Sequence, residues 1–113
     1  MLTASRDLDA LARFGRALAD PTRCRLLLIL LDGPDYPANL AESLQLTRAN
    51  VSNHLGCLRG CGLVVAVPEG RRVRYELADL RVGAALRSLT GVVLATTCDH
   101  ADLPGATPGR VPA

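Results

Sequence analysis

The chain has 113 residues, enough for one small domain. Hydrophobic residues make up 49% of it, which excludes an intrinsically disordered chain, and aromatic residues make up only 3%, so the core must consist of Leu, Val and Ala. The net charge is only +2, but residues 48–76 hold five Arg and two acidic residues. A basic excess in one short segment is typical of nucleic-acid binding.

The cysteines and the N-terminal residues indicate a compartment. Residues 1–10 contain Arg6, Asp7 and Asp9 and no apolar run, and the apolar run at residues 26–31 is too short to cross a bilayer. We therefore expect a cytoplasmic protein. In that compartment, four cysteines are expected to be reduced thiols with a metal-binding or redox role rather than structural disulfides.

The first third of the chain predicts two helices. Apolar residues recur at helical spacing from Leu8 onward and predict a helix that ends near residue 19. Asp20 and Pro21 are typical of an N-cap and a first helical position, so a second helix should run over residues 21–31. Because this helix is apolar on nearly every side, we expect it to be the central buried helix.

The next segment predicts two short helices joined by a tight turn. Pro37 should begin the third helix, and Gln45 and Leu46 should form the turn. Thr47 is a suitable N-cap for a fourth helix, which should end at residues 60–62, where Gly62 suits the position after a helix end. This layout is typical of a helix-turn-helix motif.

After residue 63 the apolar period changes from helical to alternating. Residues 64–67 predict a strand, residues 68–71 a turn and residues 72–77 a return strand, which together form a wing. Asp79 should cap a last helix that ends near residue 96. The predicted fold is therefore mainly α with a small β-hairpin wing (α+β): a winged helix-turn-helix domain over residues 1–97, in the order α-α-α-α-β-β-α. Residues 98–113 form the predicted flexible tail.

The fourth predicted helix has a polar side suited to DNA. At 100° per residue, Val51, Leu55 and Leu58 form one apolar stripe, which should face the core. Small and hydrogen-bonding residues lie opposite that stripe and could approach base edges, and the wing adds arginines for phosphates. A solvated surface is the alternative explanation. The candidate DNA-binding residues are Arg48, Asn50, Ser52, Asn53, His54, Arg59, Arg71, Arg72 and Arg74.

Four segments of the chain resemble one known family. Residues 17–23, 51–55, 62–64 and 69–75 are similar to the corresponding motifs of the ArsR/SmtB family of bacterial winged-helix repressors. The resemblance covers about residues 8–95. It implies a homodimer built on the first and last helices, binding of double-stranded operator DNA by the apo form, and release of the DNA by an inducer.

Cys57 and Cys61 are candidate metal ligands. They are four residues apart, so on a helix their thiols lie on the same face. Thiolates favour soft ions such as Cd(II), Pb(II) and Hg(II). The pair resembles that of family members that sense cadmium and lead through two cysteines on the recognition helix and one near the C-terminus, which implies Cys98 as the third ligand. The alternative is that both cysteines are ordinary small core residues.

Two further residues are candidate additional ligands. His54 lies one turn before Cys57, although packing or phosphate contact is the favoured role, and Cys24 lies in the predicted buried helix, where a structural role is favoured. The sequence favours a repressor that Cd(II) or Pb(II), and next Hg(II), releases from DNA. A repressor of the same fold that responds to As(III) or to thiol oxidation is the alternative. An enzyme is not expected, because no phosphate loop, nucleophile motif or carboxylate pair is present.

Overall fold

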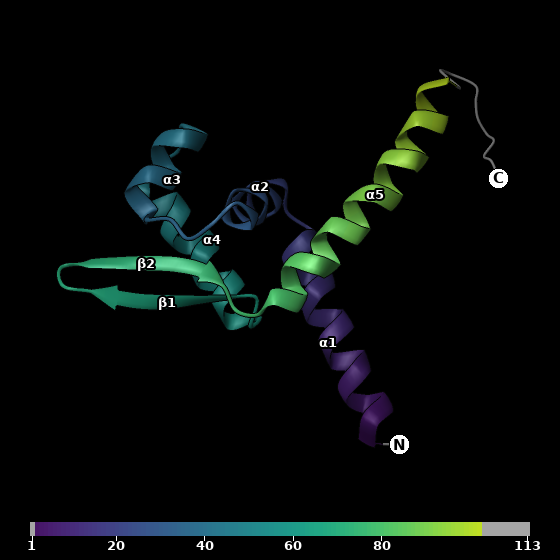
Figure 1. Cartoon of the computed structure of the whole chain (residues 1–113), viewed down its shortest axis with the longest axis horizontal. Helices are drawn as coiled ribbons and strands as arrows, with labels where there is room; N and C mark the ends of the chain where they lie inside the picture. Colours follow the sequence, from purple (N-terminus) through teal and green to yellow (C-terminus); the bar gives the residue numbers. More distant parts are fainter. Residues whose placement is uncertain (1, 103–113) are drawn as a thin grey trace. The chain divides into compact units, whose positions relative to one another are not determined.

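The computed structural model has the predicted order of elements (Figure 1). It describes the backbone of residues 2–102 and the side chains of residues 5–92. The chain divides into two compact units, of which the first runs through Val82 and the second begins at Gly83. The elements are α1 (Leu2–Leu18), α2 (Pro21–Leu31), α3 (Pro37–Leu44), α4 (Arg48–Gly60), β1 (Val64–Glu69), β2 (Arg72–Leu77) and α5 (Leu80–Asp102).

Helix α2 is the centre of the first unit, as predicted, but it is not buried on every side, because Leu28 is exposed. Asp20 caps it, since its Oδ1 accepts hydrogen bonds from the backbone N–H groups of Thr22 at 2.7 Å and Arg23 at 3.1 Å. The helix contacts α1, α4 and β2. Its buried residues are Leu26, Leu27 and Leu30.

The turn between α3 and α4 depends on two residues. Gln45 ends α3 in the left-handed region, with φ +57° and ψ +47°, which reverses the chain direction within a few residues. Thr47 then caps α4, because its Oγ1 accepts a hydrogen bond from the backbone N–H of Asn50 at 3.0 Å. The two helices form the predicted helix-turn-helix.

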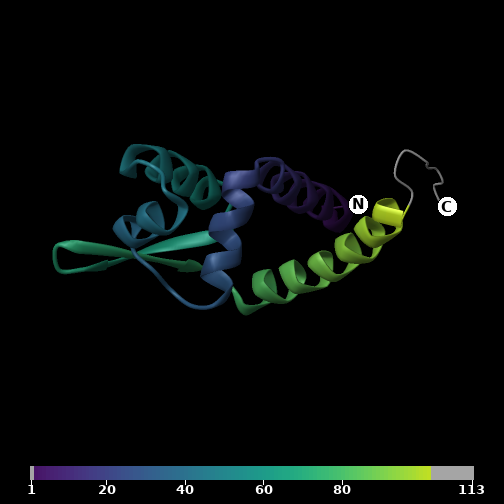
Figure 2. The same cartoon turned by 90° about the horizontal axis from the view of Figure 1, so that it is seen from above.

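Strands β1 and β2 form an antiparallel hairpin, the wing, whose turn extends past α3 and α4 of the same unit in both views (Figures 1 and 2). Glu69 pairs with Arg72, which leaves Gly70 and Arg71 as a two-residue turn. Gly70 has φ +61°, as the first position of a type II′ turn requires. The predicted turn over residues 68–71 was therefore too long: a glycine at that position makes two residues sufficient, and Pro68 and Glu69 belong to β1.

Helix α5 begins where the sequence predicted but continues further. Asp79 caps it through a 2.7 Å hydrogen bond from the backbone N–H of Arg81, and hydrogen bonds from the side chain and backbone of Arg81 lower the pKa of Asp79 from 3.8 to about 2. The helix runs to Asp102 rather than to about residue 96, because no Gly or Pro interrupts residues 92–102. Across residues 2–102, no helix has the length and apolar character needed to cross a membrane.

Candidate functional site

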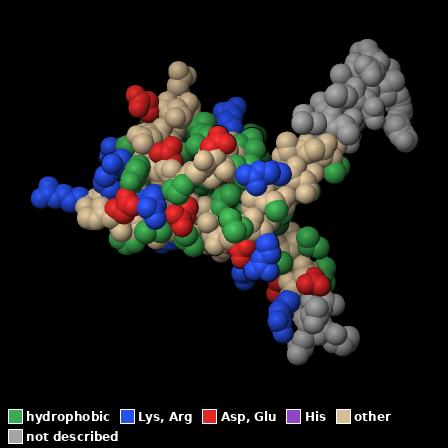
Figure 3. Space-filling view, viewed as in Figure 1, with side chains coloured by type: hydrophobic (Ala, Val, Ile, Leu, Met, Phe, Trp, Pro, Cys, Tyr) green, Lys and Arg blue, Asp and Glu red, His purple; other side chains and the backbone are tan. Residues whose placement is uncertain are grey.

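Helix α4 has one side in the core and one in solvent. Val51, Leu55 and Leu58 are fully buried, which confirms the predicted apolar stripe. The opposite side is polar or small, so side chains there are free to approach a partner. Figure 3 also shows arginine side chains around the wing and at its tip. The exposed residues of α4 include Arg48, Ala49, Asn50, Ser52, Asn53, Gly56 and Arg59.

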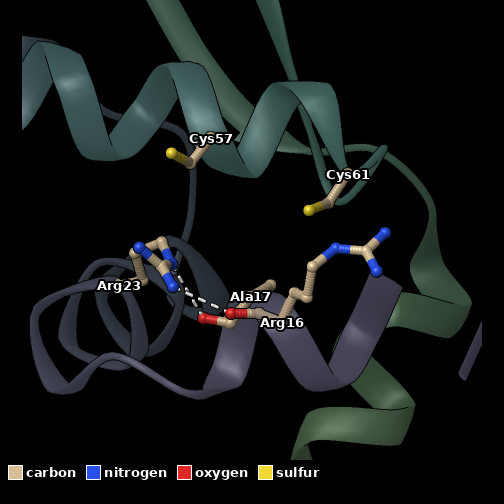
Figure 4. Close-up of a pocket in the computed structure, with 5 residues that line it drawn as sticks. All are labelled: Arg16, Ala17, Arg23, Cys57 and Cys61. Carbon is tan, nitrogen blue, oxygen red and sulfur yellow. Dashed lines mark hydrogen bonds between the residues drawn. The ribbon is translucent and has the colours of Figure 1, made fainter. Parts of the chain in front are cut away.

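Cys57, from α4, and Cys61, from the cap of that helix, point into one pocket (Figure 4). Cys57 is exposed and Cys61 half-buried, and Cys61 directly follows the last residue of α4, where its backbone N–H donates to the carbonyl of Cys57 at 3.0 Å. The pocket has a volume of about 220 Å³, and its other lining residues are Arg16, Ala17 and Arg23. Two accessible thiols on one side of a helix, outside its buried stripe, form a donor pair suited to a soft ion.

Arg23 fixes the wall opposite the thiols. Its Nη2 donates to the carbonyl of Arg16 at 2.8 Å and its Nε donates to the carbonyl of Ala17 at 3.1 Å (Figure 4). These bonds tie the start of α2 to the last turn of α1. The residues that line the pocket beside the two thiols thus include two arginines and no carboxylate. Sequence reasoning missed Arg16 and Arg23, since their place across from α4 depends on how α1 packs.

His54 contacts another residue rather than the pocket. Its Nδ1 lies 4.0 Å from Oδ1 of Asp20, and its side chain is 20% exposed. The pKa of Asp20 is lowered, chiefly by the hydrogen bond from the backbone N–H of Arg23. His54 therefore packs α4 against the N-terminus of α2, which agrees with the packing role that the sequence favoured.

The remaining candidate ligands do not join the thiol pair in the part of the chain that is described. Cys24 is half-buried, and its Sγ donates to the carbonyl of Leu18 at 3.4 Å. The side chain of Cys98 falls outside the described residues. Among the side chains that the structure does describe, no three His, Cys, Asp or Glu converge as a metal site. Cys57 and Cys61 supply two donors, enough for a two-coordinate ion or for part of a larger donor set.

Known proteins resemble this chain in both sequence and fold. Residues 20–65, which span the capped start of α2 through the first residues of β1, match the sequence pattern of bacterial regulatory proteins of the arsR family. The transcriptional regulator CmtR of Mycobacterium tuberculosis is 65% identical over 100 residues, which are 88% of this chain and 85% of CmtR. The chain belongs to the arsR family.

Two solved structures are also similar to this chain. The NMR structure of the cadmium sensor CmtR from Mycobacterium tuberculosis superposes with a TM-score of 0.62 at 68% identity, covering 73% of this chain and 85% of that one. A homodimeric winged helix-turn-helix domain from Mycobacterium bovis superposes with a TM-score of 0.76 at 31% identity, covering 86% of this chain and 89% of that one.

A probable mercury resistance operon repressor from Streptomyces lividans is 46% identical over 74 residues, which are 66% of this chain and 59% of that protein. The relatives are transcriptional regulators with a DNA-binding fold. The prediction of a DNA-binding regulator rather than an enzyme is therefore confirmed.

Proposed function

We propose that this arsR-family protein is a repressor whose metal-free homodimer binds operator DNA and is released by a thiophilic metal ion. The observation that carries the proposal is the position of Cys57 and Cys61, which point into one pocket from the helix that also has the exposed polar face. An ion held there acts directly on the helix that meets DNA. The cadmium-sensing and mercury-resistance functions named for two relatives support an ion as inducer.

Helix α4 is the proposed recognition helix, which lies in the major groove. Arg48, Ser52 and Asn53 are exposed and are proposed to contact base edges or phosphates, and Asn50 and Arg59 are proposed to contact the flanking backbone. His54 is a weaker candidate for DNA contact, because it is half-buried beside Asp20. The wing supplies further phosphate contacts.

Two exposed leucines support the proposed homodimer. Leu8 and Leu11 of α1 are 69% and 70% exposed, and they lie three residues apart on one face of that helix. A second copy that covers this face would remove both side chains from water. The homodimeric relative from Mycobacterium bovis supports the same assembly. A symmetric dimer presents two recognition helices to major grooves about 34 Å apart.

The proposed ligands are Cys57, Cys61 and, by the family resemblance, Cys98. Three thiolates suit Pb(II), and with one added donor they suit Cd(II), whereas two thiolates are sufficient for Hg(II). We therefore propose Cd(II) or Pb(II) as inducer and Hg(II) next. Cys24 and His54 are left out of the ligand set, because their side chains contact Leu18 and Asp20 instead of lining the pocket.

The arginines of the pocket suit the charge of such a complex. A divalent ion with three thiolates has a net charge of −1, so a nearby guanidinium group stabilises it. Arg23 also bonds to the last carbonyls of α1, so a shift of Arg23 toward the bound ion would loosen the contact between α1 and α2. In this proposal the ion reorients α4 and weakens its fit to DNA.

The proposal is tested by fluorescence anisotropy of DNA from the protein's own upstream region, bound by reduced metal-free protein under anaerobic conditions. Additions of Cd(II), Pb(II), Hg(II), Zn(II) and As(III) should show release by one or two soft ions near one equivalent per site. Cys57→Ser should bind the DNA as tightly as the parent but should not be released. Cys24→Ser is the matched control and should be released like the parent.

Three other outcomes would contradict the proposal. Normal release of Cys57→Ser by metal would show that the ligands are misassigned. Release by peroxide without metal would favour a repressor that senses thiol oxidation. If no ion and no oxidant releases the DNA, the cysteines have no role in regulation.

A further inference from the structure

Within the wing, the guanidinium group of Arg74 lies between two carboxylates. Nη1 of Arg74 donates to Oε2 of Glu69, and Nη2 of Arg74 lies 3.3 Å from Oε1 of Glu76. The Arg74 side chain is only 32% exposed, and its Nε is buried. A phosphate would have to displace a carboxylate to reach this guanidinium, so Arg74 is poorly placed to contact DNA.

A second wing arginine is held by an aromatic ring. The guanidinium carbon of Arg72 lies 3.5 Å from the centroid of the Tyr36 ring, a cation–π contact. The hydroxyl of Tyr36 donates to Oε1 of Glu69, the carboxylate that also binds Arg74. This hydrogen bond raises the pKa of Tyr36. Glu69 therefore connects Arg74 to Tyr36, while Arg72 contacts the Tyr36 ring directly.

Tyr36 belongs to the helix-turn-helix and not to the wing. It precedes the first residue of α3, and its neighbour Asp35 forms a backbone bridge with Tyr75 of β2. In that bridge each residue's N–H donates to the other's carbonyl, at 3.0 Å from Asp35 and 2.8 Å from Tyr75. The side-chain network and this bridge hold the wing to the start of α3.

Arg71 differs from the other two wing arginines. It occupies the second position of the turn, and it is exposed, as Arg72 also is, whereas Arg74 is half-buried. Its side chain makes no hydrogen bond, ion pair or ring contact with any residue that the structure describes. Over residues 64–77, Arg72 and Arg74 balance Glu69 and Glu76, so the net charge of +1 lies at Arg71 in the tip.

We infer that Arg71 is the wing arginine that contacts a DNA phosphate, and that Tyr36 and Glu69 hold Arg72 and Arg74 as a strut that positions the wing. From the sequence alone all three arginines were predicted to bind DNA, because the partners of Arg72 and Arg74 cannot be recognised from residue spacing. Tyr36 is a positioning residue in this arrangement. The inference rests on the proposed DNA binding but not on the proposed metal switch.

The test is the salt dependence of the Kd for operator DNA, measured with reduced metal-free protein between about 50 and about 300 mM KCl. The slope of log K against log salt is negative, and each phosphate contact adds about 0.9 to its magnitude. A dimer has two copies of Arg71, so Arg71→Ala should reduce that magnitude by about 1.8. Arg72→Ala and Arg74→Ala should reduce the magnitude by clearly less than Arg71→Ala, because they weaken the support of Arg71 but remove no phosphate contact. Arg81→Ala, which removes an exposed arginine outside the wing, is the matched control.

The strut is tested by a double-mutant cycle. Tyr36→Ala should weaken DNA binding in the parent but add nothing in the Arg71→Ala background, because the ring acts through the position of Arg71. Tyr36→Phe keeps the ring under Arg72 and should bind more tightly than Tyr36→Ala. If Tyr36→Ala does not fold, Glu69→Gln replaces it in the cycle, since this change weakens both bonds at Glu69 while keeping the shape of the side chain.

Either of two results would overturn the inference. One is a parental salt slope in Arg71→Ala, or an equal loss of slope in Arg72→Ala or Arg74→Ala. The other is a full effect of Tyr36→Ala in the Arg71→Ala background. Because metal is absent throughout, failure of the proposed metal switch would leave these measurements unchanged. Failure of the parent to bind its upstream DNA would instead contradict the proposed function.

Discussion

At the scale of single residues, neighbouring positions on α4 have different roles. Leu55 is fully buried, whereas Cys57, two residues later, is exposed and lines the pocket. A helix turns by about 200° over two residues, so the two side chains leave its axis in nearly opposite directions. The side chain at position 57 can therefore bind a ligand without taking part in core packing.

Stability measurements should separate these two roles. Leu55→Ala should lower the free energy of unfolding by about 2–5 kcal/mol, because it leaves a cavity in the core. Cys57→Ala should change it by less than about 0.5 kcal/mol, as expected for an exposed side chain. Urea denaturation of the reduced metal-free protein measures both. A loss in Cys57→Ala as large as that in Leu55→Ala would mean that the thiol is a core group rather than a free ligand.

At the scale of elements, the turn between α3 and α4 contains a strained residue. Gln45 has φ +57°, a conformation that costs an ordinary L-residue roughly 1–2 kcal/mol. Glycine adopts it without that cost but loses about 0.5–1 kcal/mol through the greater freedom of the unfolded chain. Gln45→Gly should therefore stabilise the protein by up to about 1 kcal/mol, which thermal or urea denaturation would detect.

A matched control for this substitution lies two residues earlier. Ser43 is exposed inside α3, where glycine is unfavourable, so Ser43→Gly should destabilise the protein by about 0.5 kcal/mol. Opposite signs for the two substitutions would show that backbone strain at Gln45 decides the result. If Gln45→Gly destabilises as much as Ser43→Gly, the strain is offset by contacts of the Gln45 side chain.

The sequence predicted those elements whose limits are set by local chemistry. Asp20 and Pro21 predicted the start of α2, and Thr47 that of α4, because a cap bonds to residues only two or three positions away. The predicted end of α5 near residue 96 was too early, because no Gly or Pro lies between that point and Asp102, and the first breaker in the sequence is Pro104. The contact between Tyr36 and Glu69 joins residues 33 positions apart, and no local pattern predicts such a pair.

The candidate site was predictable to a similar extent. The i, i+4 spacing placed Cys57 and Cys61 on one side of α4, because helix geometry alone decides this. The arginines across the pocket were missed, since they come from α1 and α2. The contact of His54 with Asp20 likewise depends on how two helices pack. The sequence alone therefore left metal binding, packing and phosphate contact open for His54.

At the scale of the whole molecule, the proposed dimer can be tested by substitutions on the exposed face of α1. Replacing Leu8 and Leu11 with Asp should give a monomer, because two exposed leucines on one helix face are replaced by charges that repel across a symmetric interface. Analytical ultracentrifugation of the parent and the double variant measures the change. Leu28→Asp, at another leucine with an exposed fraction of 48%, is the control. A double variant that remains dimeric would exclude this face of α1 from the interface.

The proposed switch also requires that metal and DNA weaken each other's binding by the same factor. If an ion at Cys57 and Cys61 lowers the affinity of the dimer for operator DNA by some factor, operator DNA must lower the affinity for that ion by the same factor, because both paths end in the same ternary complex. Couplings of this kind are typically about 1–3 kcal/mol, or roughly 5–150-fold. Competition with a chromophoric chelator measures Cd(II) affinity with and without saturating DNA, and anisotropy measures DNA affinity with and without Cd(II). Equal factors are expected for the parent, and both should fall to one in Cys57→Ser. If Cd(II) releases the DNA while DNA leaves Cd(II) affinity unchanged, release comes from another process, such as cross-linking of exposed thiols between dimers, and α4 is not the switch.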